Sequence, residues 1–140
     1  MVTDRFSHVQ TWVFDLDNTL YPPKARLFDQ IEIRMTAWVM RELSIGREEA
    51  DHLRRQYWAQ YGTTLAGLMR EHAVDPAPYL HEVHEIDMSH LVPDPTLAKG
   101  IRALPGRRIV YTNGSRPYAE RVVACLLYTS DAADEHRDVG

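Results

Sequence analysis

The sequence predicts an α/β fold in which two parallel strands are separated by a long helical insertion. The run 9–16 is typical of a short buried strand that enters an acidic loop, and the run 107–112 is typical of a second strand. The stretch 24–92 between them shows helical periodicity without any strand pattern. Because strand–helix–strand connections are right-handed and set their strands parallel, both carboxyl ends should lie at one sheet edge, where ligands bind.

The first strand leads directly into an acidic loop. Residues 12–22 read Trp-Val-Phe-Asp-Leu-Asp-Asn-Thr-Leu-Tyr-Pro, so Asp15 and Asp17 follow the apolar run one residue apart. In extended backbone, side chains at i and i+2 point the same way, which predicts that both carboxylates face one spot. Two like charges so close require a cation, a shared proton or both. An EF-hand calcium loop starting at Asp15 would require Gly and Glu where this chain has Leu20 and Arg26.

Several helices are expected between residues 24 and 92. Apolar side chains share helix faces at Leu27, Ile31, Met35, Trp38 and Val39, and again at Leu53, Tyr57 and Tyr61. We expect Gly46 and Gly62 to end these two helices. Thr64 is expected to cap a short third helix, and Asp75 followed by Pro76 is typical of the start of a fourth.

Residues 93–124 return to alternating helix and strand. Asp94 followed by Pro95 predicts a capped helix, and Pro105-Gly106 predicts a turn into the second strand. Ser115 and Pro117 predict the start of the last helix. The apolar residues of these two helices are Leu97, Ile101 and Leu104, then Tyr118, Val122 and Val123.

Residues 14–22 resemble the first motif of the haloacid dehalogenase-like (HAD) hydrolase superfamily, and in this longer form its pyrimidine 5′-nucleotidase branch. The resemblance implies a Rossmann-like HAD core with an inserted all-helical cap, and a phosphatase that uses Mg²⁺. It implies that Asp15 is the nucleophile, that Asp17 is the general acid and base, and that Thr19 supports the loop. Asp15 and Asp17, the latter through its main-chain carbonyl, would hold the metal.

Residues 109–115, Ile-Val-Tyr-Thr-Asn-Gly-Ser, resemble the second motif of the superfamily. There the hydroxyl, here that of Thr112, holds a phosphate oxygen, and the adjacent amides, here of Asn113 and Gly114, help to cradle it. A hydroxyl and N–H groups at a strand-to-helix junction make an anion site. Alone, Asn113-Gly114 would also suit a hairpin, but a helical pattern follows where a second strand would be needed.

The predicted domains are a partial HAD core at 1–21 and 93–124, a helical cap at 22–92, and a tail at 125–140. The tail resembles a translated sequencing adapter, so we expect it to be non-native and disordered. In the superfamily, a Lys or Arg and further acidic metal ligands follow the second motif. We therefore expect a C-terminally truncated core of about two strands, with weak metal binding and little turnover.

The function predicted from these motifs is hydrolysis of a nucleoside 5′-monophosphate, most specifically a pyrimidine nucleotide, through an aspartyl-phosphate. The alternatives are a HAD phosphatase for another small phosphate ester, carbon–halogen cleavage, and a non-catalytic fragment that binds phosphate. Dehalogenases of the superfamily usually lack an acid at the position of Asp17, so that residue favours phosphate chemistry.

Composition argues against several other partners. The 140 residues carry a net charge of −4, which gives no sign of a nucleic-acid polymer or a membrane as partner. A single cysteine and an N-terminus unlike a signal peptide predict a cytoplasmic protein. The substrate class, a small-molecule phosphate ester, is thus the expected partner, and the sequence does not indicate an oligomeric state.

Three weaker patterns lie in the helical stretch. His81 and His84 lie at helical spacing, with Glu82, Glu85 and His90 nearby. This pattern suggests either a metal site or, as we prefer, a polar helix face. Tyr57, Trp58 and Tyr61 suit base stacking or, preferably, core packing. Residues 61–68 resemble a segment of the nucleotidase branch that would contact substrate, although a helix cap explains Thr64 equally well.

Overall fold

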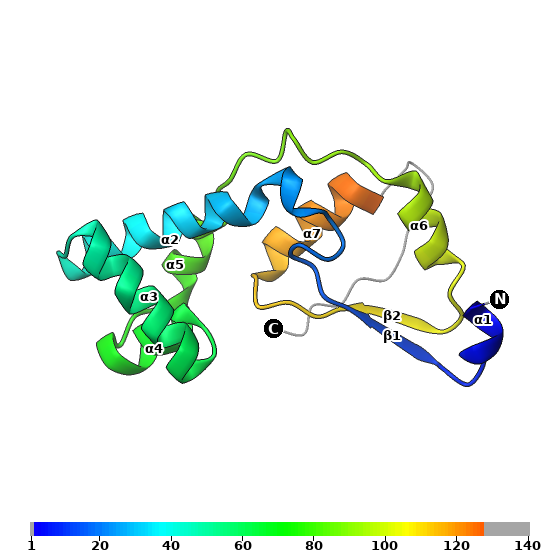
Figure 1. Cartoon of the computed structure of the whole chain (residues 1–140), viewed down its shortest axis with the longest axis horizontal. Coiled ribbons are helices and arrows are strands. Elements are labelled where there is room, and N and C mark those ends of the chain that lie inside the picture. Colours follow the sequence, from blue (N-terminus) through cyan, green and yellow to red (C-terminus); the bar gives the residue numbers. More distant parts are fainter. Residues whose placement is uncertain (1, 128–140) are drawn as a thin grey trace. The chain divides into compact units, whose positions relative to one another are not determined.

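Two strands pair in parallel, as the sequence predicts. The computed structural model describes residues 2–127, and in it β1 (Thr11–Phe14) lies beside β2 (Arg107–Val110) with Phe14 opposite Val110 (Figure 1). Both strands are shorter than the predicted runs 9–16 and 107–112. The fold class is therefore α/β among the described residues, with a sheet of two strands.

The prediction that the first strand is buried is wrong. Along β1, Trp12 and Phe14 are half-buried while Thr11 is exposed and Val13 is 62% exposed. This alternation is that of a sheet covered on one face only, since successive side chains point to opposite faces. The apolar run alone cannot distinguish a strand covered on both faces from one covered on a single face.

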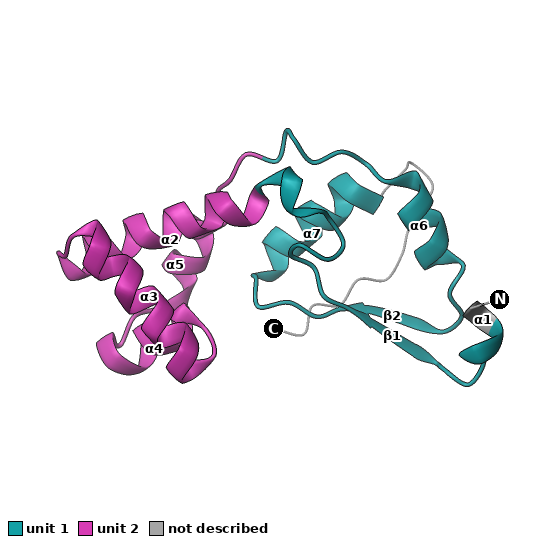
Figure 2. Ribbon diagram, in the orientation of Figure 1, with its two compact units in different colours: residues 1–26, 88–140 teal, residues 27–87 magenta. Residues whose placement is uncertain are grey.

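The chain divides into two compact units (Figure 2). One contains residues 1–26 and 88–140, and the other is the continuous segment Leu27–Asp87. The predicted cap, residues 22–92, extends five residues further at each end than this segment, since 27 − 22 and 92 − 87 both equal 5.

The first unit also contains short helices. They are α1 (Val2–Arg5), which the sequence did not predict, the 3₁₀ turn η1 (Pro23–Ala25), α6 (Pro95–Arg102) and α7 (Arg116–Leu127). Asp94 caps α6 as predicted, because its carboxylate accepts a hydrogen bond from the amide of Leu97 at 3.0 Å. In α6 the buried residue is Ala98, and the predicted apolar stripe is only half-buried.

Helix α7 extends past the predicted start of the tail. Leu126 is buried, and its carbonyl accepts a hydrogen bond from the amide of Asp94 at 2.9 Å. Residues 125–127 therefore complete a helix, contrary to the expectation of a disordered tail from residue 125. The rest of that predicted tail, 128–140, lies outside the described residues.

The second unit consists of four helices joined by short connections. They are α2 (Leu27–Leu43), α3 (Arg47–Tyr61), α4 (Thr64–His72) and α5 (Pro76–Val83). Helix α2 ends before the predicted Gly46: Ser44 takes a left-handed conformation at φ 55°, and the amide of Ile45 bonds the carbonyl of Met40. Gly46 instead precedes α3 as its N-cap residue, whereas Gly62 ends α3 as predicted.

The cap of α4 is Thr63, one residue before the predicted Thr64. The Thr63 hydroxyl accepts from the amide of Ala66 at 3.0 Å, while the buried Thr64 hydroxyl donates to the carbonyl of Arg54 at 3.1 Å. Gly67 then lets α4 approach α3, because a Cβ there would lie 2.3 Å from Cγ of Tyr57. The Thr63 hydroxyl therefore caps α4, and the Thr64 hydroxyl joins α4 to α3.

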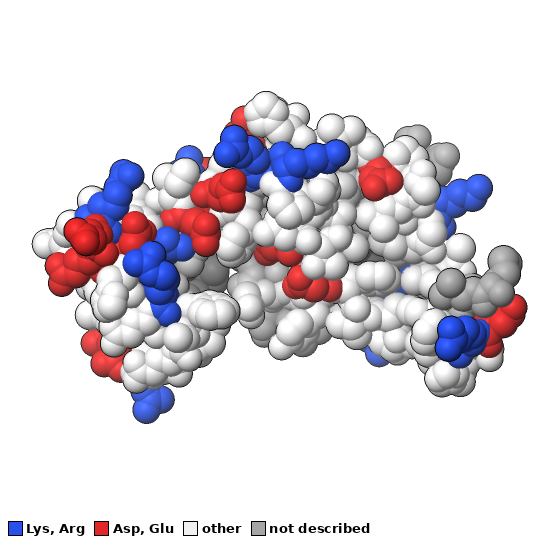
Figure 3. Space-filling model, in the orientation of Figure 1, with Lys and Arg blue, Asp and Glu red and all other residues white. Residues whose placement is uncertain are grey.

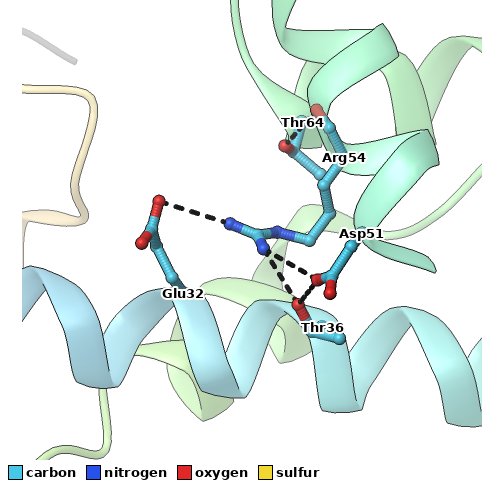
Figure 4. Close-up of polar contacts among 5 residues, drawn as sticks. All are labelled: Glu32, Thr36, Asp51, Arg54 and Thr64. Atoms are coloured by element: carbon cyan, nitrogen blue, oxygen red, sulfur yellow. Dashed lines mark hydrogen bonds and ion pairs between the residues drawn. The ribbon is translucent and has the colours of Figure 1, made fainter. Parts of the chain in front are cut away.

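A half-buried arginine joins three helices of this unit (Figure 4). The Nη1 of Arg54 donates to Oγ1 of Thr36 at 2.9 Å, and Nη2 lies 3.6 Å from a Glu32 carboxylate oxygen. Thr36 donates to Asp51 at 2.6 Å, and this bond, together with the charge of Arg54, holds the pKa of Asp51 below its ordinary value. Buried charges need such partners, so this cluster fixes α2, α3 and α4 to one another.

Helix α5 returns along α2. The rings of Trp38 and Tyr79 pack edge to face with centroids 5.1 Å apart. Arg41 donates hydrogen bonds of 2.7 Å to both carboxylate oxygens of Glu82. At the end of the unit, the Gln30 amide exchanges two 2.9 Å hydrogen bonds with the main chain of Asp87. The last residue of this segment therefore lies beside its first helix.

Charged side chains of both signs are interspersed over the helical unit on the face shown in Figure 3. Among the helices of residues 2–127, none is long and apolar enough to cross a membrane.

Candidate functional site

The acidic loop and the predicted phosphate loop emerge at the same edge of the sheet. Beyond the paired strands, the amide of Tyr111 still donates to the carbonyl of Phe14 at 2.8 Å. Asp15 follows Phe14 directly, and Thr112 follows Tyr111. The parallel register therefore brings the two sequence motifs together at the carboxyl ends of both strands, although they are about a hundred residues apart in the chain.

Asp15 is exposed and is held by the loop that it begins. The hydroxyl of Thr19 donates to Oδ2 of Asp15 at 2.7 Å. The loop closes through a 3.0 Å hydrogen bond from the Leu20 amide to the Leu16 carbonyl, with Asn18 in the left-handed conformation at φ 57°. Thr19, which the resemblance implies to be a support of the loop, contacts the carboxylate itself.

Asp17 is half-buried and bonded to two tyrosines. The hydroxyls of Tyr21 and Tyr118 both donate to its Oδ1, at 2.5 and 2.6 Å, and the two phenol oxygens lie 3.3 Å apart. Both tyrosine side chains are buried, with 0% and 1% exposure. A single carboxylate oxygen thus receives two hydrogen bonds from two different elements, the loop after β1 and helix α7.

Sequence reasoning missed the roles of both tyrosines. Tyr118 was expected only as a core residue of the last helix, and Tyr21 was not singled out. The available signal was general: a tyrosine buried in an apolar stripe needs a partner for its hydroxyl. The sequence cannot identify that partner, because Asp17 and Tyr118 are 101 residues apart and are joined only by the fold.

Burial raises the pKa of both phenols above the ordinary tyrosine value, and so does the hydrogen bond of each to Asp17. Burial likewise raises the pKa of Tyr79 in the helical unit. Each of these groups therefore keeps its proton in the folded chain at a pH where it ionises in the unfolded chain.

We expect stability to fall in alkali for this reason. The unfolded chain releases its phenol protons near pH 10, so the free energy of unfolding should be level below that pH and decline above it. Each retained proton contributes a slope of up to about 1.4 kcal/mol per pH unit. Urea unfolding between neutral pH and pH 11 tests this. Tyr118→Phe should lessen the decline of the free energy of unfolding with pH. A free energy of unfolding that stays constant up to pH 11 would contradict the raised pKa values of the buried tyrosines.

Thr112 is buried at 3% exposure directly after β2, where its hydroxyl accepts the amide of Gly114 at 3.0 Å. The hydroxyl retains its own hydrogen for donation to an anion. The Gly114 amide, predicted to cradle phosphate, is engaged with this hydroxyl, and Asn113 is exposed beside it. A Cβ on Gly114 would lie 2.9 Å from the Tyr118 ring, so this turn and the tyrosine fit closely.

The predicted convergence of Asp15 and Asp17 does not follow from strand geometry. The strand ends at Phe14, so the alternation of side chains in extended backbone stops before either carboxylate. Fully buried Leu16 lies between them, and the two side chains have different partners. Their placement is therefore a property of the loop.

The donor set at Asp15 suits a magnesium ion by its chemistry. This carboxylate is exposed, and among the described residues only its Oδ2 is bonded, to Thr19. Mg²⁺ prefers oxygen ligands, keeps several waters and uses one or two carboxylates with substrate phosphate. Residues 2–127 contain no group of three or more His, Cys, Asp and Glu side chains that would hold a metal. The candidate metal ligands at this site are the ones that the resemblance implies, the Asp15 carboxylate and the main-chain carbonyl of Asp17.

Of the predicted pair of histidines, His81 lies in α5 and His84 follows its last residue. The described part of the chain contains no group of three or more His, Cys, Asp or Glu side chains that could hold a metal. His81 pairs with Glu85 at 2.9 Å on the exposed face, as the preferred interpretation expects, whereas His84 is buried. Tyr57 is buried and bonds His72 at 2.7 Å, which confirms core packing, but Trp58 is 68% exposed.

Of the comparisons with known proteins, the search of family models gives no match to this sequence.

Proposed function

We propose that this protein is a HAD-like phosphomonoester hydrolase whose substrate is a nucleoside 5′-monophosphate, with a preference for pyrimidine nucleotides. The reaction proceeds through an aspartyl-phosphate. The single observation that carries the proposal is the shared edge: the Asp15–Asp17 loop and the Thr112 turn leave adjacent parallel strands at their carboxyl ends. A nucleophilic carboxylate beside an anion-holding hydroxyl is the arrangement that phosphoryl transfer needs.

In this proposal Asp15 attacks phosphorus, and Thr19 orients its carboxylate through the 2.7 Å hydrogen bond. The hydroxyl of Thr112 donates a hydrogen bond to a phosphate oxygen. Asp17 protonates the departing 5′ oxygen and then takes a proton from the water that hydrolyses the aspartyl-phosphate. A bound Mg²⁺ would supply charge neutralisation on the phosphate oxygens.

We also propose that this chain turns over slowly. Catalysis of phosphoryl transfer depends on positioning and on neutralising charge. In the described part of the chain, the hydrogen bonds to Asp15 and Asp17 come from the hydroxyl groups of threonine and tyrosine, and not from a lysine or an arginine. Another small phosphate ester as substrate and a phosphate-binding role without turnover are the alternatives.

Phosphate release measured with magnesium and with EDTA tests the proposal. The chain should hydrolyse p-nitrophenyl phosphate slowly and only with magnesium, and a panel of nucleoside 5′-monophosphates and sugar phosphates should favour pyrimidine nucleotides. Trifluoroberyllate, which mimics an aspartyl-phosphate, should bind with magnesium and be seen by ¹⁹F NMR. Thr112→Val, which keeps the shape and removes the hydroxyl, should weaken both. Absence of both turnover and the fluoride adduct would refute the proposal.

A further inference from the structure

Asp17 and its two tyrosines form a hydrogen-bonded group within the candidate site. Two buried hydroxyls donate to the same carboxylate oxygen at 2.5 and 2.6 Å. Side-chain hydrogen bonds to a charged group are individually strong, and two of them at one oxygen restrict how the carboxylate turns. Both of these bonds go to Oδ1, and neither of them engages the other oxygen, Oδ2.

We infer that Tyr21 and Tyr118 are positioning residues that clamp Oδ1 of Asp17 and leave Oδ2 to exchange a proton with the leaving group. This inference rests on the proposed phosphatase function and extends it by two residues. Helix α7 supplies one of the phenols, and its Tyr118 ring also packs against Gly114 of the phosphate turn. The same side chain thus links the proton-transferring group to the turn that holds phosphate.

Leaving-group chemistry separates this role from a purely structural one. An alkyl alcohol such as the nucleoside 5′ oxygen is a poor leaving group and needs a proton, whereas p-nitrophenolate leaves without one. A residue that positions the proton donor matters for the first and much less for the second. A residue that only stabilises the fold affects both substrates equally.

The experiment compares Tyr118→Phe and Tyr21→Phe with the unmodified chain. On a nucleoside 5′-monophosphate, kcat should fall by about 10- to 100-fold, with KM changed little because Thr112 is untouched. On p-nitrophenyl phosphate the fall should be less than about threefold, in line with the same reasoning. Equal losses on both substrates would overturn the inference while leaving the proposed function intact.

Tyr79→Phe is the matched control. Tyr79 is 2% exposed in the helical unit, and its hydroxyl has no hydrogen-bond partner among the described residues. The substitution removes a buried phenol hydroxyl without touching Asp17, so the ratio of the two rates should stay unchanged.

A second measurement needs no turnover. Tyr118→Phe should lower the urea midpoint in the unmodified chain and lower it by less than half as much in an Asp17→Ala background, because the hydroxyl's partner is already gone. Equal shifts in both backgrounds would show that the phenol does not act on Asp17 and would overturn the inference. This result stands even where magnesium-dependent hydrolysis fails, so the two proposals fail separately.

Discussion

Replacing Asp15 by asparagine should abolish magnesium-dependent phosphate release and leave the fold intact. The amide keeps the shape of the carboxylate and can still accept the Thr19 hydroxyl, but it cannot form an acyl phosphate. We expect the rate to fall by about three orders of magnitude or more, as when a covalent nucleophile is removed elsewhere. Phosphate release gives the rate, and circular dichroism verifies the fold.

Asp4→Asn is the control for this substitution. Asp4 is an exposed aspartate in α1, before β1 begins, so the same change of charge occurs away from the carboxyl ends of the strands. Its rate should match that of the unmodified chain. If Asp15→Asn retained a rate within tenfold of Asp4→Asn, the assignment of the nucleophile would be wrong.

Gly106→Ala is expected to destabilise the sheet severely. Gly106 lies at φ 89°, a conformation that side chains rarely adopt, and an added Cβ would come within 2.3 Å of the Gln10 carbonyl oxygen. That same oxygen accepts the Arg107 amide at 2.9 Å where the two strands begin to pair. Because main chain cannot yield as a side chain does, we expect a loss of about 2–4 kcal/mol. Urea unfolding measures it.

Gly100→Ala provides the comparison. Gly100 lies within α6, and an added Cβ would meet nothing within 4 Å. Alanine is the better helix former, so this variant should be as stable as the original or more stable by up to about 1 kcal/mol. Similar losses for the two variants would contradict the steric argument at Gly106.

Local signals in the sequence predicted the helices well. Asp75 and Asp94 each precede a proline and each cap a helix, because their carboxylates satisfy amides that the first turn leaves unbonded. The error at the start of α4 is a shift of one residue and has a similar cause. Thr63 and Thr64 are chemically equivalent as caps, and only the packing of Thr64 onto Arg54 decides between them.

The burial of the strands was less predictable. Val13 belongs to an apolar run and yet is 62% exposed, because burial depends on what covers each face of the sheet. The end of α2 was also hard to predict. The helix is followed by Ser44 in a left-handed conformation, before the Gly46 at which the sequence predicted the end.

The sequence by itself determined the order of the two strands and of helices α2 to α7, the two motifs, and the candidate residues Asp15, Asp17 and Thr112, since these depend on composition and spacing along the chain. Tertiary structure alone decided which side chains hold Asp17. Tyr21 lies four residues away and Tyr118 lies 101 residues away, and both reach one oxygen because α7 packs beside the loop after β1. Hydrogen bonds act over about 3 Å of space, whatever the separation along the chain.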